Sequence, residues 1–395
     1  MASLCLALSL LCLATALHTK EKSRPCFNVG TTYDRWVCDG DNVTSIPDFL
    51  PDHLTDIIFQ RTSIRELQTD AFQRFKNLQS IVIRNSKLTK IQPFAFRGLP
   101  NLKELIIVEN YLLTTLSTNS FGSINGDRIS KHIVLRRNGF VSIEERAFND
   151  SRHIRTLDLR LNGVKIIHSH AFSGLYHVVF FHLPESVKVI EPDAFSGLVR
   201  VHYMEIVHWH TDYTKPHTFR GLQQVKTLSI HHSHLGDLKA QTFGDMETIE
   251  FLYIFNSEIG FVSKESFASI HNIRLIVFKW CHIARIHPSI SHQIVHKLVL
   301  FEDNKIDCVC DNAWIVASEN GLPENITKTT TCLPGKFGDK SLSEIRENLW
   351  MSCFPSKRDY ILPENWKSPT SDANLTNYTL IALLATIISA FYLQI

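Results

Sequence analysis

The fold is decided by one stretch, IRTLDLRLNGVKIIHSHAFSGL, residues 154–175. It opens with the pattern I-x-x-L-x-L-x-x-N-x-V, in which Leu157 and Leu159 lie two positions apart. That spacing is typical of a short strand whose alternate side chains point to one face. A turn and an apolar segment that contains Phe172 follow, so the stretch predicts one strand and one return segment.

The same arrangement recurs along most of the chain, and phenylalanine marks it. Copies of the strand pattern begin at Leu102 and Val225. A period of about 24 residues predicts a solenoid, because no single unit could bury its apolar residues alone. The marker residues, separated by 23 to 27 positions, are Phe72, Phe96, Phe121, Phe148, Phe172, Phe195, Phe219, Phe243 and Phe267.

With these motifs the chain resembles the leucine-rich repeat family of animal extracellular proteins, over residues 54–305 in about eleven units. Within that family it is similar to glycoprotein-hormone-receptor ectodomains and to insect adhesion proteins, although a seven-helix region is lacking. The resemblance implies an α/β-type solenoid, a horseshoe with a parallel β-sheet on its concave face. Apolar columns of Leu/Ile and of Phe would fill the interior.

The resemblance also implies disulfide-stapled caps at both ends of the solenoid. Residues 18–53 resemble an N-terminal cap, with Cys26 joined to Cys38, and residues 306–353 resemble a C-terminal cap. The four cysteines of the second cap allow three pairings. Adjacent Cys308 and Cys310 are too close to bond to each other. The family implies the pairs Cys308–Cys332 and Cys310–Cys353.

The ninth position of each unit faces inward, where a small polar group can bond neighbouring backbone. We assign Cys281 to this interior column; a reactive or intermolecular thiol is the alternative reading. Residues 184–190 and 209–216 break the register, so the sixth and seventh units are irregular. The ninth-position residues are Thr62, Ser86, Asn110, Asn138, Asn162, Ser233, Ser257, Cys281 and Asn304.

The two ends of the chain predict export and anchoring. Residues 1–17 are apolar and end in small residues, which is typical of a secretory signal. Residues 354–371 form a short stalk, and residues 372–395 match a glycolipid-attachment signal with attachment at Ser371. A short transmembrane tail is the alternative. Glycosylation acceptors at Asn42, Asn149 and Asn325 fit the same secretory route.

Two groups of side chains are expected on the concave face. A basic strip occupies its N-terminal half, and an exposed aromatic cluster, flanked by His231 and Lys279, occupies its C-terminal half. Aromatic and basic groups together are typical anchors of protein interfaces. The alternative is that long side chains merely cover the sheet. The strip is Arg84, Arg136, Arg137 and Arg160, and the cluster is Phe251, Tyr253, Phe255 and Trp280.

Histidines crowd the stretch LSIHHSHL, residues 228–235. By the repeat register His231 projects from the concave face and His232 lies at its edge, with His234 just past the turn. Three readings remain open: a solvated surface, a contact that senses pH, and a zinc site. Side chains in one row point the same way rather than converging, so we favour the solvated surface and expect no metal.

The sequence predicts recognition rather than catalysis. We find no G-x-S-x-G, no H-E-x-x-H and no phosphate-binding glycine loop, so neither an enzyme nor a cofactor is expected. The net charge of +2 does not favour nucleic acid. We expect a cell-surface protein, lipid-anchored on the extracellular side, that binds a protein ligand or a neighbouring receptor in adhesion or as a co-receptor. An anchor without a cytoplasmic domain would need a signalling partner. The alternatives are a secreted or shed ligand trap and, least favoured, a zinc hydrolase.

Overall fold

The computed structural model describes residues 25–29, 34–125, 131–263, 265–267, 270, 272–288, 298–317 and 324–354, without the side chains of 298 and 324–326. The predicted signal, the stalk beyond residue 354, the attachment signal with Ser371, and the side chain of Asn325 lie outside the described residues. No helix in the described ranges is long and apolar enough to cross a bilayer.

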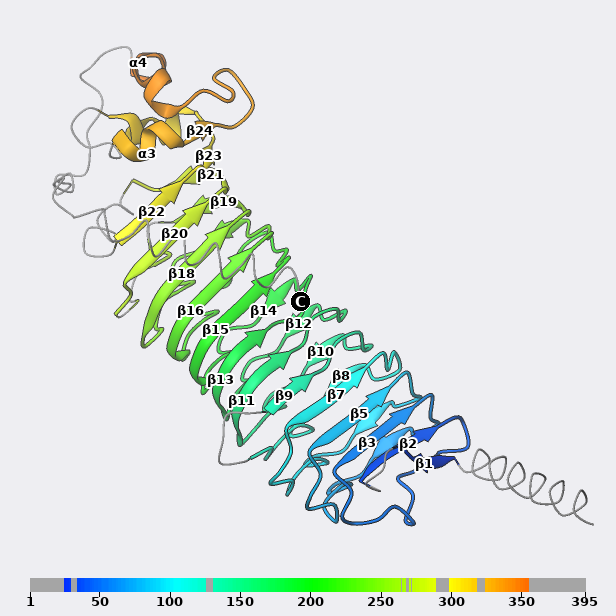
Figure 1. Cartoon of the computed structure of the whole chain (residues 1–395). Coiled ribbons are helices and arrows are strands. Elements are labelled where there is room, and N and C mark those ends of the chain that lie inside the picture. The colour runs from blue at the N-terminus through cyan, green and yellow to red at the C-terminus, as the bar shows by residue number, and fades with distance from the viewer. Residues whose placement is uncertain are drawn as a thin grey trace, which may run out of the picture.

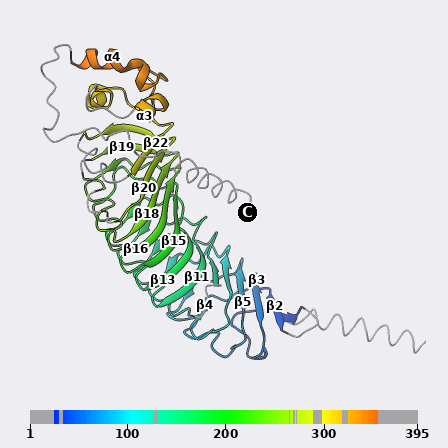
Figure 2. The same cartoon turned by 60° about the vertical axis from the view of Figure 1, so that its left-hand side comes forward.

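The predicted solenoid is confirmed, with one strand from each repeat joined side by side in a parallel sheet. Figures 1 and 2 show these strands stacked into a curved arc with the sheet along it. The repeat strands in the described part are β3 (Asp56–Gln60), β5 (Ser80–Arg84), β7 (Glu104–Val108), β9 (Lys131–Val134), β11 (Ser151–Asp158), β13 (Leu175–His182), β15 (Val199–Val207), β16 (Gln223–His231), β18 (Ile249–Phe255), β20 (Leu275–Lys279) and β22 (Leu298–Glu302).

The return segments of the units carry shorter strands that pair with their neighbours in parallel and make smaller second sheets. Within each of these smaller sheets, neighbouring units therefore bond to each other both through the main sheet and through their return segments. These strands are β4 (Glu66–Leu67), β6 (Lys90–Ile91), β8 (Thr115–Leu116), β10 (Ser142–Ile143), β12 (Ile166–Ile167), β14 (Val189–Ile190), β17 (Asp237–Leu238), β19 (Glu258–Val262), β21 (His282–Ile286) and β23 (Lys305–Ile306).

The N-terminal cap extends the main sheet. β2 (Arg35–Asp39) pairs with β3 in parallel, and β1 (Cys26–Asn28) pairs with β2 antiparallel. The disulfide Cys26–Cys38 joins β1 to β2. An antiparallel strand cannot continue the repeat, so β1 closes the edge of the sheet.

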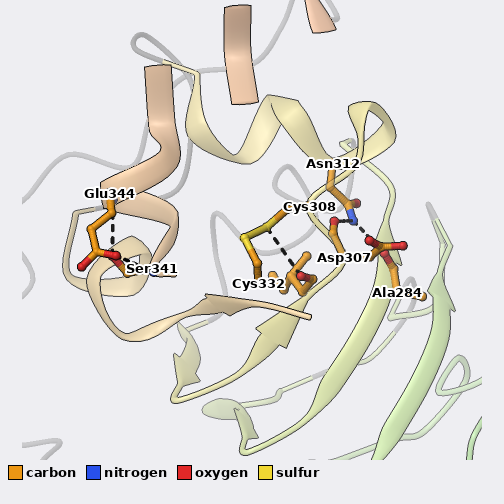
Figure 3. The surroundings of a disulfide bond; sticks show 8 residues. Ala284, Asp307, Cys308, Asn312, Cys332, Ser341 and Glu344 are labelled. Atoms are coloured by element: carbon orange, nitrogen blue, oxygen red, sulfur yellow. Dashed lines mark hydrogen bonds between the residues drawn. A yellow bond between two sulfur atoms is a disulfide. The ribbon is translucent and has the colours of Figure 1, made fainter. Parts of the chain in front are cut away.

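The C-terminal cap consists of the 3-10 helix η1 (Cys310–Val316), α3 (Glu324–Thr329), β24 (Thr331–Cys332) and α4 (Leu342–Cys353). It contains the disulfides Cys308–Cys332 and Cys310–Cys353, the pairs that the resemblance implies. Figure 3 shows Asn312 reaching back from η1, where its Nδ2 donates to the carbonyls of Ala284 and Asp307 at 2.7 Å each. The cap is thereby tied to the last repeats through bonds as well as through apolar contact.

The marker phenylalanines form a single buried spine, as their spacing predicts. All nine are at most 2 % exposed. The ring centroids of successive members lie 5.1 to 6.1 Å apart from Phe72 to Phe267. Such spacing is that of favourable aromatic pairs, so the period of the sequence is the period of ring stacking.

The ninth-position residues form a second interior column, also as predicted, and most of them bond the backbone of the preceding unit. Asn138 Oδ1 accepts from the backbone N–H of Asn110 at 3.0 Å, and Asn162 Oδ1 accepts from that of Asn138 at 2.8 Å. The ladder skips the sixth unit, where Ser186 is exposed. It resumes at buried Trp209, whose backbone N–H donates to Ser233 Oγ at 3.0 Å. The irregularity expected in these units is thus a break in this ladder.

Cys281 lies in the same column, and the interior reading of this cysteine is confirmed. Its thiol is free and fully buried. The Sγ atom lies 3.3 Å from the carbonyl oxygen of Ile254. Burial raises the pKa of the thiol to about 12, so at neutral pH it is protonated and unreactive.

Candidate functional site on the concave face

The register of the sheet places the predicted outward residues in straight columns. One central column runs through Asp158, His182, Glu205, Ser229 and Tyr253, each the Cα partner of the next. Its neighbours toward both ends of the sheet are apolar. The middle of the concave face is therefore polar, within a column that is otherwise aliphatic or aromatic.

Asp158 is the most buried carboxylate of this face, with a side chain 2 % exposed. Arg136 Nε donates to its Oδ2 at 2.6 Å, and Arg160 donates through Nε at 3.1 Å and through a terminal nitrogen at 2.8 Å. Burial alone would raise the pKa of Asp158, but the hydrogen bonds from Arg160 and Arg136 outweigh it and hold that pKa at about 2. The carboxylate is charged at every physiological pH.

The expectation of an open basic strip needs correction here. Arg136 and Arg160 fold back over Asp158, because a buried carboxylate without partners would be very costly. Arg84 stays exposed, but its Nε donates to Gln60 Oε1 at 3.1 Å. Arg137 lies 3.6 Å from a carboxylate oxygen of Glu109. The arginines are close together, yet their charges are largely compensated within the chain.

Glu205 is the second centre of the polar network. His182 Nδ1 lies 2.6 Å from its Oε2 and His231 Nε2 lies 3.0 Å from its Oε1. Arg160 approaches the same carboxylate at 4.0 Å. Burial would raise the pKa of Glu205, but the hydrogen bonds with His182 and His231 outweigh it and lower that pKa well below its usual range. Arg160 therefore links the two carboxylates into one network across four strands.

The histidine-rich stretch divides into two environments. His231 is on the concave face as predicted, but it is not solvated: its side chain is 13 % exposed. Its ring stacks on Phe255 with centroids 4.5 Å apart. A solvated surface was the wrong expectation for His231, because the repeat register fixes direction and not what covers a side chain.

The other histidines of the stretch lie at the edge. Burial, and then the neighbours His231 and His208, lower the pKa of His232. His234 Nδ1 lies 2.9 Å from Glu258 Oε2. His210, His234, Glu258 and His282 lie in one row, as the register predicts. Among the described residues, no group of three or more His, Cys, Asp or Glu side chains converges as metal ligands would.

The aromatic cluster lies together, but most of it is only half exposed. Phe251 and Tyr253 have ring centroids 6.2 Å apart, and burial raises the pKa of Tyr253. Trp280 is the exception, with 44 % of its surface exposed. Lys279 Nζ lies 4.8 Å from the Trp280 ring centroid and 2.8 Å from Glu302 Oε2. The expectation of an exposed cluster is thus correct for Trp280 and wrong for Phe251, Tyr253 and Phe255, which are partly buried. Phe251 pairs with Tyr253, and Phe255 stacks on His231.

The polar network is the feature that the sequence analysis missed. Asp158, His182 and Glu205 are given no role there. A signal was present: four consecutive polar or charged residues, Asp158, His182, Glu205 and Ser229, replace the aliphatic residues found at this position in the first four units. Asp158 stands in this column, and arginines lie two residues after the column position in its own unit (Arg160) and in the preceding unit (Arg136). Such an arrangement predicts an internal ion pair.

Comparisons with known proteins agree with this architecture. A family model described as BspA type leucine rich repeat region matches residues 141–274 in six copies, and a leucine rich repeat model matches 52–112 and 76–126. The chain therefore belongs to the leucine-rich repeat family. A search of characterised protein sequences gave no match.

Three solved structures are similar at low identity. In the TLR13–ssRNA13 complex the match is 18 % identical, with a TM-score of 0.39, over 71 % of this chain and 48 % of that one. In the octameric complex of Latrophilin 3, Unc5D and FLRT2 the match is 17 % identical, with a TM-score of 0.47, over 78 % of this chain and 94 % of that one. In human 5T4, the trophoblast glycoprotein, it is 15 % identical, with a TM-score of 0.33, over 81 % of this chain and 95 % of that one. This chain thus matches about half of the first structure and nearly all of the other two.

Proposed function

We propose that this protein recognises another protein through the C-terminal half of its concave face, around Trp280. An indole that is 44 % exposed directly after the end of β20, beside Lys279, is the observation that carries the proposal. Tryptophan is enriched among the residues that dominate binding energy at protein interfaces. The half-buried Phe251, Tyr253 and Phe255 supply a rigid apolar floor next to it. Few side chains there would lose freedom on binding.

The proposal places the protein outside the cell. Three disulfides stabilise the two caps, and such bonds persist in oxidising compartments. We propose the chain organisation expected above: signal, capped repeats, stalk, and a lipid anchor near Ser371. A lipid-anchored recognition protein would act in adhesion or as a co-receptor, with a partner carrying any signal. Phospholipase C treatment of intact cells should release the protein if the anchor is a glycolipid.

A shed or secreted ligand trap is the second candidate. The same face would serve, and the attachment signal distinguishes the two. If all of the protein is found in the medium of untreated cells, the trap replaces the co-receptor.

The binding face is tested on living cells with the full chain. Proximity labelling of its neighbours is compared for the unaltered protein, for Trp280→Ala and for Tyr111→Ala. Tyr111 is 64 % exposed and lies in an N-terminal unit. Tyr111→Ala is therefore the control, because it removes an exposed aromatic side chain outside the proposed face. Trp280→Ala should reduce capture of the partner roughly tenfold or more, as for an interface residue of the dominant kind. Tyr111→Ala should leave capture unchanged.

Surface level, measured through an appended epitope, is the control in the same experiment. Equal neighbour profiles for all three proteins at equal surface level would refute the proposed face. A variant with both Tyr253→Ala and Phe255→Ala should also weaken capture. Because Phe255 packs on His231, that variant is interpreted only at matched surface level.

A further inference from the structure

A second surface lies along the edge of the sheet where four consecutive strands begin. In β11, β13, β15 and β16 one residue near the start has a left-handed backbone, with φ between 53° and 60°. These bulges interrupt the alternation of the strands, so that neighbouring side chains both turn outward. We name this surface the basic edge. Its residues are Arg152, His153, Arg155, Tyr176, His177, Arg200, His202 and Lys226.

Positive groups on the basic edge are crowded and poorly compensated. Arg155 and Lys226 are exposed, and neither makes an ion pair or side-chain hydrogen bond with another described residue. Arg200 is exposed as well; its guanidinium lies 5.5 Å from the ring centroid of Tyr176, and its Nε donates to Gln224 Oε1 at 3.1 Å. None of these three cations is paired with a carboxylate within the described part of the chain.

The histidines of the basic edge form a row across three strands. The His177 ring lies 5.5 Å from that of His153 and 5.7 Å from that of His202. Burial, and then the neighbours His153, His202 and Arg200, lower the pKa of His177. Arg152 on this surface forms an ion pair with Asp150 at 2.8 Å. Glu250 continues the row beyond Lys226, but it lies 3.6 Å from Arg274.

We propose that the basic edge binds a linear sulfated polysaccharide. Sulfate groups carry fixed negative charge, and arginine forks bind such oxyanions through paired hydrogen bonds. Parallel strands repeat at ~4.8 Å, so Arg155 on β11, Arg200 on β15 and Lys226 on β16 are spread over about 14 Å. Cations spread over that length suit an extended, repeatedly charged chain better than they suit one small anion. This surface is separate from the one around Trp280.

Sulfated polysaccharide is favoured over the two other polyanions. The disulfides point to an oxidising compartment outside the cytosol, where nucleic acid is not the usual partner. Proteins that lie on anionic membranes combine basic groups with inserted apolar side chains. None of the exposed large apolar side chains of the described residues belongs to the basic edge.

The test uses the purified full chain in neutral detergent and immobilised heparin as the probe. The variant Arg155→Gln/Arg200→Gln/Lys226→Gln removes three charges from the basic edge. The control Arg65→Gln/Lys165→Gln/Lys188→Gln removes three exposed charges from elsewhere on the solenoid. The variant should bind roughly tenfold or more weakly, with a shallower dependence of affinity on salt, because fewer counterions are released. The control should bind as the unaltered protein does.

Further measurements compare heparin with other polyanions and cover the case in which the variant does not fold. Heparin stripped of its sulfates should not bind; single-stranded DNA and phosphatidylserine vesicles should bind much more weakly than heparin. The proposal is overturned if the unaltered protein does not bind heparin, if the control loses as much affinity as the variant, or if DNA or vesicles bind equally well.

If the variant does not fold, heparin must protect Lys226 of the unaltered protein from acetylation, and equal acetylation with and without heparin refutes the site. Trp280→Ala should keep heparin binding, so failure of one surface does not imply failure of the other.

Discussion

Replacement of Asp158 by asparagine tests whether internal charge pairs hold the centre of the concave face. The side chain keeps its shape but loses its charge, so Arg136 and Arg160 lose a common partner. The pKa of Asp158 lies at about 2 against an ordinary 3.8, and each tenfold change in an acid constant is worth ~1.4 kcal/mol. The charge of the carboxylate therefore contributes about 2 kcal/mol to stability at neutral pH. The arginines are 37 % and 27 % exposed and can regain water, so the loss should stay below the 3–5 kcal/mol typical of a fully buried broken pair.

The contribution of Asp158 to stability should decrease as the pH falls. Because the folded pKa is depressed, the contribution is complete above the unfolded pKa near 4 and disappears as the pH falls toward about 2. Urea unfolding followed by circular dichroism should show Asp158→Asn destabilised at pH 7, with the gap to the unaltered protein closing between pH 4 and pH 2. Asp41→Asn is the matched control, since Asp41 also forms an ion pair, with Lys87, but is 73 % exposed; this replacement should change the stability little. A gap that is absent at pH 7, or that persists undiminished at pH 2.5, would refute the reasoning.

Two further predictions concern the interior. Phe172→Ala should cost 3–5 kcal/mol in urea unfolding, because Phe172 is stacked between Phe148 and Phe195 in the spine and its removal leaves a cavity; a loss under 1 kcal/mol would contradict the stacked spine. Cys281 should resist iodoacetamide at pH 8 in the native protein and react fully in denaturant, because burial raises its pKa to about 12. Rapid labelling of the native thiol, measured by mass spectrometry, would show that this column is not closed.

The interior of the protein could be predicted from the sequence because it is periodic. Each buried position is repeated about eleven times, and a strand with period two leaves one choice for which side chains face inward. Phe72 and Phe267, nearly 200 residues apart in the chain, could therefore be assigned to the same spine. The sixth unit could be recognised as irregular, but the skipped ladder bond at Ser186 and the substitution of Trp209 could not, because both depend on how the shortened unit packs.

The surface was less predictable for a physical reason. The register gives the direction of a side chain at its Cβ atom, and a long side chain then turns toward whatever charge lies near. Arg160 was expected to face a ligand, and it faces Asp158 instead. His231 was expected to face water, and Phe255 covers it. Pairing across units is set by electrostatics and desolvation, which hydrophobic periodicity does not record.

The break in the asparagine and serine ladder at the sixth unit also affects how the arc bends. In a solenoid each unit touches only its neighbours, so flexing concentrates wherever one lateral tie is missing. At that place the bonds from His182 and Arg160 to Glu205 join the strands on the concave side. The contacts to Glu205 therefore supply, on the concave side, a lateral connection between units at the place where the interior ladder lacks one.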